Sequence, residues 1–193
     1  MMGTARRRTC CLQGKKTFDG RMPAFPKRYA EAAAMIFRSM TKQDDAALAA
    51  IIRDNLEAYG LDVPGTAYFD PDLDRLSAYY LSDPAARCYL ILTDDAGTVA
   101  GGVGLAAFAP FEHCAELQKL YLADAFKGAG LGYALIEAIE DKARSLGYRR
   151  MYLETHDCLA AAVHLYEKCG YRRIERPDGV VHSSMNRFYL KEL

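Results

Sequence analysis

The sequence has no run of about 18 apolar residues, which excludes a membrane-spanning helix. It shows no secretory apolar segment, no low-complexity repeat and no collagen-like or disulfide-dense composition. Net charge is also absent, because 25 Lys and Arg oppose 25 Asp and Glu. With 193 residues, of which 51% are hydrophobic and 26% charged, the chain has the composition of one ordinary globular domain with a real core.

The zero net charge hides an uneven distribution of charge along the chain. Residues 1–28 hold eight basic residues and one acid, Asp19, which gives +7, while residues 29–193 hold 17 basic and 24 acidic residues, which gives −7. Residues 1–33 lack helical and strand periodicity and contain several Gly and Pro. We therefore predict a basic, flexible N-terminal extension over 1–33, followed by a folded domain over 34–193. Targeting, nucleic-acid contact and no role at all remain open for the extension.

The six cysteines show neither the C-x-x-C spacing nor another metal-ligand spacing, and the four histidines are scattered. We therefore assign no metal site and expect free thiols in a reducing, cytoplasmic compartment.

The hydrophobic pattern becomes regular from Met35 onward. Strands are expected at 35–40, 88–92, 99–108, 116–122, 151–155, 171–175 and 187–190, and helices at 46–59, 72–81, 131–146 and 159–168. Thr41 followed by Asp44 is a helix-start signature, and Gly60, Gly147 and Gly170 end helices. The order β-α-α-β-β-β-α-β-α-β-β predicts an α/β fold with one mixed sheet of about seven strands and helices on both faces.

A glycine-rich loop, Lys127-Gly128-Ala129-Gly130-Leu131-Gly132, lies between an expected strand and the longest expected helix. Backbone N–H groups at a helix start favour anions, so a phosphate or pyrophosphate is the expected ligand. A P-loop needs Gly-Lys-Ser/Thr, whereas Tyr133 follows Gly132, and Tyr133 also breaks the dinucleotide fingerprint. Glu154 stands where a ribose-binding acid would, but too few residues follow it for that fold.

The loop instead resembles the acetyl-CoA pyrophosphate motif of the GNAT superfamily of N-acetyltransferases, Gln/Arg-x-x-Gly-x-Gly/Ala. Lys127 occupies the Gln/Arg position, and Gly130 and Gly132 match. The segment Leu165-Tyr166-Glu167-Lys168-Cys169-Gly170-Tyr171 resembles a second family motif. The resemblance covers 35–193 and implies the GNAT fold and acetyl-CoA as cosubstrate without a metal. One departure stands at Cys158 and Leu159, where many members carry an Asn that touches the pantetheine arm.

The resemblance also implies a set of site residues. Glu116 is the candidate general base and Tyr166 the candidate acid for the leaving thiolate, with Glu112 and Glu154 as weaker substitutes for the base. The Leu122 N–H would polarise the thioester carbonyl, and the backbone of Leu120 and Leu122 would pair with the pantetheine amides. The expected cofactor-binding residues are Leu120, Tyr121, Leu122, Lys127, Gly128, Ala129, Gly130, Leu131, Gly132, Tyr133 and Lys168.

The acceptor pocket is expected between the first two helices and the last two strands. Residues 53–83 hold seven acids and two bases, which would attract a cationic amine or simply form a solvated face. Tyr59, Tyr68, Phe69, Tyr79 and Tyr80 are candidates for an aromatic wall, with core positions for the tyrosines as the alternative, and His156 and His182 could flank the pocket.

The sequence therefore predicts direct acetyl transfer from acetyl-CoA to a primary amine of a small molecule. Protein or peptide N-acetylation and a non-catalytic acyl-CoA sensor of the same fold are the alternatives. We expect no nucleic-acid or membrane partner and leave a homodimer open.

Overall fold

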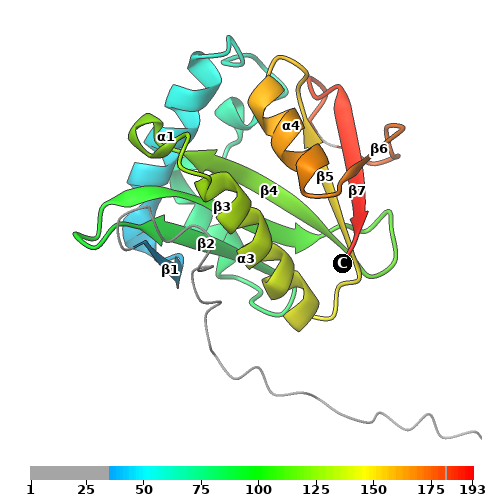
Figure 1. Cartoon of the computed structure of the whole chain (residues 1–193), viewed down its shortest axis with the longest axis horizontal. Coiled ribbons are helices and arrows are strands. Elements are labelled where there is room, and N and C mark those ends of the chain that lie inside the picture. The colour runs from blue at the N-terminus through cyan, green and yellow to red at the C-terminus, as the bar shows by residue number, and fades with distance from the viewer. Residues whose placement is uncertain (1–34, 181) are drawn as a thin grey trace, which may run out of the picture.

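The computed structural model describes residues 35–180 and 182–193 (Figure 1). Its strands are β1 (Ile36–Ser39), β2 (Arg87–Thr93), β3 (Val99–Ala107), β4 (Cys114–Leu122), β5 (Arg150–Thr155), β6 (Arg172–Ile174) and β7 (Arg187–Glu192). Its helices are α1 (Asp45–Glu57), α2 (Leu76–Tyr80), α3 (Leu131–Ser145) and α4 (Ala160–Lys168). The predicted element order is confirmed. The predicted extension over 1–33 lies outside the described residues and stays a prediction.

One seven-stranded sheet has the order β1-β2-β3-β4-β5-β7-β6. Neighbouring strands pair antiparallel except for β4 and β5, which are parallel and are connected through α3. The prediction of a mixed sheet is therefore confirmed. The terminal strands pair with each other as expected, and β7 also inserts between β6 and β5.

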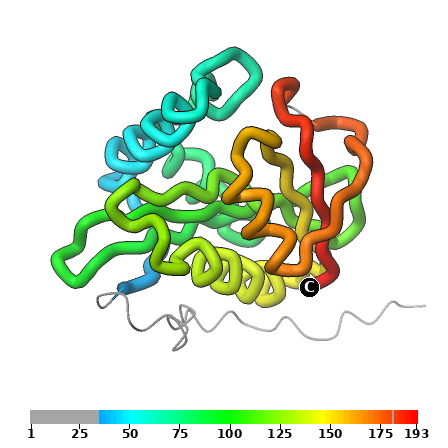
Figure 2. Tube along the Cα trace, turned by 45° about the horizontal axis from the view of Figure 1, so that its top comes forward, coloured from blue at the N-terminus to red at the C-terminus, as the bar shows by residue number. Residues whose placement is uncertain are grey.

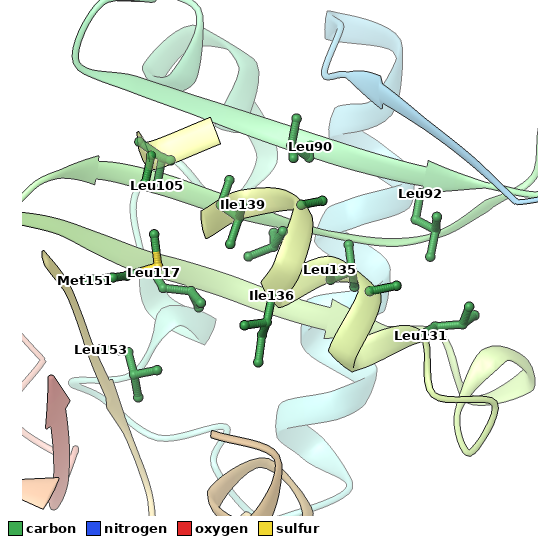
Figure 3. Packing of buried hydrophobic residues seen from close by; sticks show 14 of the residues in the cluster. Leu90, Leu92, Leu105, Leu117, Leu131, Leu135, Ile136, Ile139, Met151 and Leu153 are labelled. Atoms are coloured by element: carbon green, nitrogen blue, oxygen red, sulfur yellow. The ribbon is translucent and has the colours of Figure 1, made fainter. Parts of the chain in front are cut away.

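Helices cover both faces of the sheet (Figures 1 and 2). The face under α3 and α4 carries the larger apolar cluster, in which leucines and isoleucines of α3 lie over β2, β3, β4 and β5 (Figure 3). Leu135 and Ile139 are fully buried there, and such side chains each contribute about 1.5–3 kcal/mol to stability. The opposite face packs against α1 and α2 and includes Tyr80 and Tyr89.

The start of the first helical segment confirms the predicted capping signature. Thr41 and Asp44 form a capping box, and Asp44 also accepts two hydrogen bonds from the Arg38 guanidinium at 2.6 and 2.7 Å. That guanidinium and the Thr41 hydrogen bonds hold the pKa of the Asp44 carboxyl below its usual value. The segment Lys42–Asp44 is a 3₁₀ turn, so the α-helix begins at Asp45.

No helix among the described residues is long and apolar enough to cross a membrane. Cys88, Cys114 and Cys158 are free thiols, whereas Cys10 and Cys11 lie outside the described residues. The cytoplasmic location stays a prediction.

Candidate active site

The cavity. A cavity of about 460 Å³ opens where β4 and β5 separate, between α1, α4 and the glycine loop. The two strands pair only from Cys114 with Arg150 to Glu116 with Tyr152, although β4 continues to Leu122 and β5 to Thr155. Beyond Glu116, therefore, the edge of β4 that faces β5 has no strand partner among the described residues. The walls include eleven of the predicted site residues, namely Glu116, Leu120, Tyr121, Leu122, Lys127, Gly128, Gly130, Leu131, Gly132, Tyr133 and Tyr166.

Two predicted cofactor residues do not line this cavity. Ala129 is exposed at the tip of the glycine loop, and Lys168 is exposed in the last turn of α4. The motif spacing could not show that Ala129 differs from its neighbours in exposure. That difference depends on the path of the backbone, in which Gly128 and Gly130 on either side have positive φ angles.

The open edge of β4. The Ala123 N–H donates to the Ala100 carbonyl at 2.9 Å. Because neighbouring peptide groups alternate in direction along a strand, the Leu122 N–H and carbonyl point away from β3, toward the opening. The Leu122 carbonyl accepts a hydrogen bond from Asn55 Nδ2 at 2.9 Å, and the same amide donates to Ile51. The expected pairing of Leu122 with a pantetheine amide is therefore confined to its N–H. Asn55 lines the cavity and was missed by the sequence reasoning, since nothing marks a helical Asn as a partner of a residue 67 positions away.

A bulge in β4. Gly102 pairs with Tyr121 and Gly104 with Gln118, so β4 carries one extra residue between these pairs. Lys119 adopts a positive φ of 49° at this point, which is uncommon for a residue other than glycine. The Tyr89 hydroxyl donates to the Lys119 carbonyl at 2.7 Å and satisfies the backbone that the bulge frees. Lys119 lines the cavity, beside Gln118 and Leu120.

The glycine loop. A 3₁₀ turn at Asp124–Phe126 leads into the loop, and α3 begins immediately after Gly130. Gly130 has a φ of 75°, in the left-handed region that favours glycine, and it has no side chain with which to cap the helix. The first N–H groups of α3 are thus left to bind an anion. Gly132 lets the helix start approach α4, because a Cβ there would lie 2.9 Å from Leu165 Cδ2. Lys127 Nζ lies 2.6 Å from Asp124 Oδ1 and adds positive charge beside the loop.

The candidate base. Glu116 stands on β4 at the last residue paired with β5, and its side chain lines the cavity. Burial raises the pKa of its carboxyl, a hydrogen bond from Gln118 Nε2 at 2.6 Å opposes this rise, and the nearby Glu154 carboxylate adds to it. A carboxyl with a raised pKa next to a cavity can accept a proton at neutral pH.

Four charged side chains from separate parts of the chain meet at one end of the cavity. The sequence predicts the acceptor pocket there, and we call it the acceptor end. His182 Nδ1 lies 2.5 Å from Glu154 Oε1, and its Nε2 lies 3.3 Å from Asp70 Oδ1. Asp70 Oδ2 in turn lies 2.6 Å from Lys119 Nζ. We call Asp70, Lys119, Glu154 and His182 the charged network.

The protonation of this network follows from its contacts. The hydrogen bonds to Asp70 and Glu154 raise the pKa of His182 to about 9, so the imidazole is a cation at neutral pH. Burial of Asp70 favours its neutral form, but His182 and Lys119 outweigh it and lower the pKa of the carboxyl. The sequence had suggested His182 at the pocket and Glu154 as a substitute base, and both line the cavity. Their connection through Asp70 was missed, because the partners are 112 positions apart.

The candidate acid. Tyr166 lies on α4 with 6% of its surface exposed, and it lines the cavity. Its ring packs 6.0 Å from that of Tyr171 and 6.5 Å from that of Tyr189, measured between ring centroids. Burial raises the pKa of its hydroxyl, so the phenol keeps its proton at neutral pH.

Of the five candidates for an aromatic wall, only Tyr59 lines the cavity, and the alternative of a core position holds for Tyr80. Phe69 and Tyr79 are exposed, Tyr68 donates to Glu57 Oε1 at 2.6 Å outside the cavity lining, and Tyr80 is buried in the core under α2. His156 and Glu112 likewise stand outside the cavity lining. The aromatic pattern could not distinguish core from pocket, because both favour the same residue types.

Two loops are joined at the acceptor end. The Ser184 hydroxyl donates to the Pro64 carbonyl at 2.9 Å, and the Ser184 N–H donates to the Gly65 carbonyl at 3.4 Å. Gly65 has no room for a side chain, since a Cβ there would lie 2.4 Å from Ser183 Oγ. Together with the contact between His182 and Asp70, these bonds connect the loop after α1 to the loop before β7.

Comparison with known proteins. A model of the Acetyltransferase (GNAT) family matches residues 48–171. The uncharacterized N-acetyltransferase YjgM of Escherichia coli is 37% identical over 142 residues, which cover 72% of this chain and 83% of that protein. An acetyltransferase of the GNAT family from Staphylococcus aureus has a similar structure, with a TM-score of 0.70, 20% identity and coverage of 83% of this chain and 99% of that one. The PaiA N-acetyltransferase of Thermoplasma acidophilum, solved in complex with coenzyme A, has a TM-score of 0.67 with 18% identity and the same coverage of both chains.

Proposed function

The chain belongs to the GNAT family of acetyltransferases, and on that premise we propose that it transfers an acetyl group from acetyl-CoA directly to a primary amine of a small molecule. The observation that carries the proposal is a single cavity in which the glycine loop, the open edge of β4, Glu116 and Tyr166 meet.

The residues present fit acetyl-CoA. The N–H groups at the start of α3, with Lys127 beside them, suit a pyrophosphate, and the open N–H of Leu122 suits an amide of the pantetheine arm or the thioester carbonyl. When bound, acetyl-CoA supplies the acetyl group as an activated thioester. The structural neighbour solved with coenzyme A supports the same assignment.

Glu116 removes the proton that keeps an amine from attacking. An ammonium has no lone pair, so the acceptor must lose one proton before its nitrogen can bond to the acetyl carbon. The Glu116 carboxylate takes that proton, directly or through one water. Its raised pKa places it closer to neutral pH than an exposed glutamate, which suits proton transfer at working pH.

Tyr166 and the Leu122 N–H act on the other side of the reaction. The Leu122 N–H stabilises the negative charge that develops on the carbonyl oxygen during attack. The Tyr166 hydroxyl, which is protonated at neutral pH before the reaction, donates its proton to the sulfur as the C–S bond breaks, and the second proton that the acetylated nitrogen loses restores the phenol. The enzyme itself forms no covalent bond to the acetyl group in this route.

The charge at the acceptor end supports a cationic amine. Two carboxyl groups, those of Glu116 and Glu154, line the cavity together with two cations, Lys119 and His182. A third carboxyl group, that of Asp70, lies outside the lining and pairs with both cations. With Glu116 ionised, these three carboxylates and two cations have a net charge of −1, which the ammonium group of an acceptor neutralises. An acceptor that carries a further negative charge next to its amine would leave the acceptor end with a net negative charge again.

The joined loops support a small acceptor over an internal lysine of a protein. The bonds of Ser184 to Pro64 and Gly65 connect the loops on both sides of the acceptor end. A continuous polypeptide that passes across the site would have to separate them, whereas an amine that enters end-on would not.

The experiment compares acceptors under identical conditions. Purified protein with acetyl-CoA is given small diamines, amino acids, peptides with a free N-terminus and peptides with an internal lysine, and free thiol is measured. We expect the highest kcat/KM for small cationic amines. A higher kcat/KM for a peptide would transfer the assignment to protein N-acetylation. Binding of acetyl-CoA without turnover of any amine would contradict enzymatic transfer to amines and favour a sensor.

A further inference from the structure

The glycine-rich strand β3 lets two buried tyrosines reach the bulge in β4. A Cβ on Gly102 would lie 2.4 Å from Cε1 of Tyr89, and one on Gly104 would lie 2.7 Å from Cζ and the hydroxyl of Tyr80. Both rings belong to the apolar cluster under α1 and α2, and they pack against each other at 5.0 Å between centroids. Through these two gaps, the hydroxyl of Tyr89 reaches the Lys119 carbonyl and that of Tyr80 reaches Gln118.

The hydrogen bond from the Tyr80 hydroxyl fixes the orientation of the Gln118 side-chain amide. Tyr80 Oη lies 2.9 Å from Gln118 Oε1, and Gln118 Nε2 lies 2.6 Å from Glu116 Oε2. An ionised carboxylate only accepts hydrogen bonds, so the amide must present its NH₂ group to Glu116 and its oxygen to the Tyr80 hydroxyl. The result is a directed chain of hydrogen bonds that starts in the core and ends on one oxygen of Glu116.

Glu116 and Gln118 can form this chain because they share one face of β4. Residues two apart in a strand point to the same side, and Leu117 between them points into the cluster under α3. The bulge follows immediately after Gln118, so the register that pairs Gln118 with Gly104 ends there. Moving the bulge by one residue would take Gln118 away from the gap through which Tyr80 reaches it.

We propose that Gln118, held by the Tyr80 hydroxyl through the gap at Gly104, is a positioning residue that orients the Glu116 carboxylate for proton abstraction from the acceptor amine. The hydrogen bond occupies Oε2 and leaves Oε1 for the proton of the acceptor. This inference rests on the proposed function, because it assigns to Glu116 the role of base.

Several other groups face Glu116 and act on the same carboxyl. They are Glu154 and Tyr152 on β5, His182 in the loop before β7, Lys119 and Cys114 on β4, and Tyr80 on α2. Burial and Glu154 favour the protonated acid, whereas Gln118, His182 and Lys119 favour the carboxylate. Among these groups Gln118 donates a direct hydrogen bond to Glu116, so its removal should move the titration of Glu116 without removing a charge.

The test is the pH profile of kcat/KM for wild type and for Gln118→Met, which keeps the length of the side chain and loses its donor. We expect the acidic limb, the low-pH side of the profile on which kcat/KM rises, to move to higher pH by about one unit. At a pH on this limb kcat/KM then falls about tenfold, and on the high-pH plateau it changes less. Tyr80→Phe should move the limb in the same direction by less. Gln43→Met on the exposed 3₁₀ turn and Tyr148→Phe, whose hydroxyl donates to Ala86 on another part of the surface, are the matched controls and should leave the limb in place.

Two results would overturn the inference. One is an unchanged acidic limb in Gln118→Met when thermal unfolding shows the variant folded. The other is a full additional loss from Gln118→Met in a Glu116→Gln background, because a residue that acts through Glu116 has little left to act on there.

A carboxyl-detected NMR titration of Glu116 in wild type and Gln118→Met separates this inference from the proposed function. If no amine is acetylated, the proposed function fails. A titration that does not respond to Gln118→Met contradicts the positioning role whether or not the protein is active.

Discussion

His182 joins the loops of the acceptor end through its positive charge, which makes the stability of the protein depend on pH in a defined direction. The pKa of His182 is about 9 in the folded protein, against an ordinary value of 6.5. The imidazolium is bonded to Glu154 on β5 and to Asp70 in the loop that precedes α2. Folding is therefore favoured by the protonated form, and this contribution is fully present below about pH 6.5.

The size of the effect follows from the shift. A difference of about 2.5 units corresponds to ~3 kcal/mol at full value. Because 27% of the side chain remains exposed, screening by water reduces this to about 2 kcal/mol. The contribution declines as pH rises above the unfolded pKa and is lost once pH passes the folded value near 9.

The assay is urea unfolding of wild type and His182→Gln at several pH values between 6 and 9.5. Other groups titrate in this range in both proteins, so the informative quantity is the difference in unfolding free energy between them. We expect this difference to shrink by about 2 kcal/mol from pH 6 to pH 9.5. A difference that stays constant across the range would refute the reasoning, because it would show that His182 contributes by packing and not by charge.

Three further predictions concern the reaction itself. Glu116→Gln should lower kcat/KM by roughly 10² to 10⁴ while calorimetry shows acetyl-CoA binding unchanged, and a loss under about threefold would remove Glu116 from the role of base. Tyr166→Phe should lower kcat about tenfold or more with little change in the acceptor KM, so an unchanged kcat would count against it as the acid. Gly130→Ala forces a side chain into a φ of 75° at a cost of about 1–2 kcal/mol and should raise the KM for acetyl-CoA, whereas the control Gly147→Ala, at a φ of 90° after the end of α3, should lower the melting temperature alone. Equal KM values in these two glycine variants would contradict the role of the loop.

The order of helices and strands could be predicted from the sequence because it depends on short-range patterns. Helix α3 shows this most clearly, since apolar residues recur at helical spacing from Leu131 and Gly147 ends the pattern. The glycine loop and Tyr166 could be placed by motif, because their spacing to the helix start and within α4 is local. The helix boundaries moved by up to four residues, and the largest shift is at the helix predicted over 72–81, where the 3₁₀ turn Leu73–Arg75 replaced the first turn and the α-helix begins at Leu76.

The acceptor end could not be predicted in the same way. Asp70 and Lys119 are 49 positions apart, and Glu154 and His182 are 28 apart, so the pairs exist only once the sheet has formed. The bulge at Lys119 had no local signal, since a lysine with positive φ is unusual. The glycines of β3 make room for Tyr80 and Tyr89, which come from other elements, so no local pattern could predict this use of them.

The most direct test of the account is a reaction of the 193-residue chain with acetyl-CoA and a small diamine, in which free coenzyme A and N-acetylated amine are quantified in the same sample by mass spectrometry. The account predicts equal amounts of both products, formed only when the amine is present and nearly abolished by Glu116→Gln. Release of coenzyme A without acetylated amine, or full activity of Glu116→Gln, would contradict it.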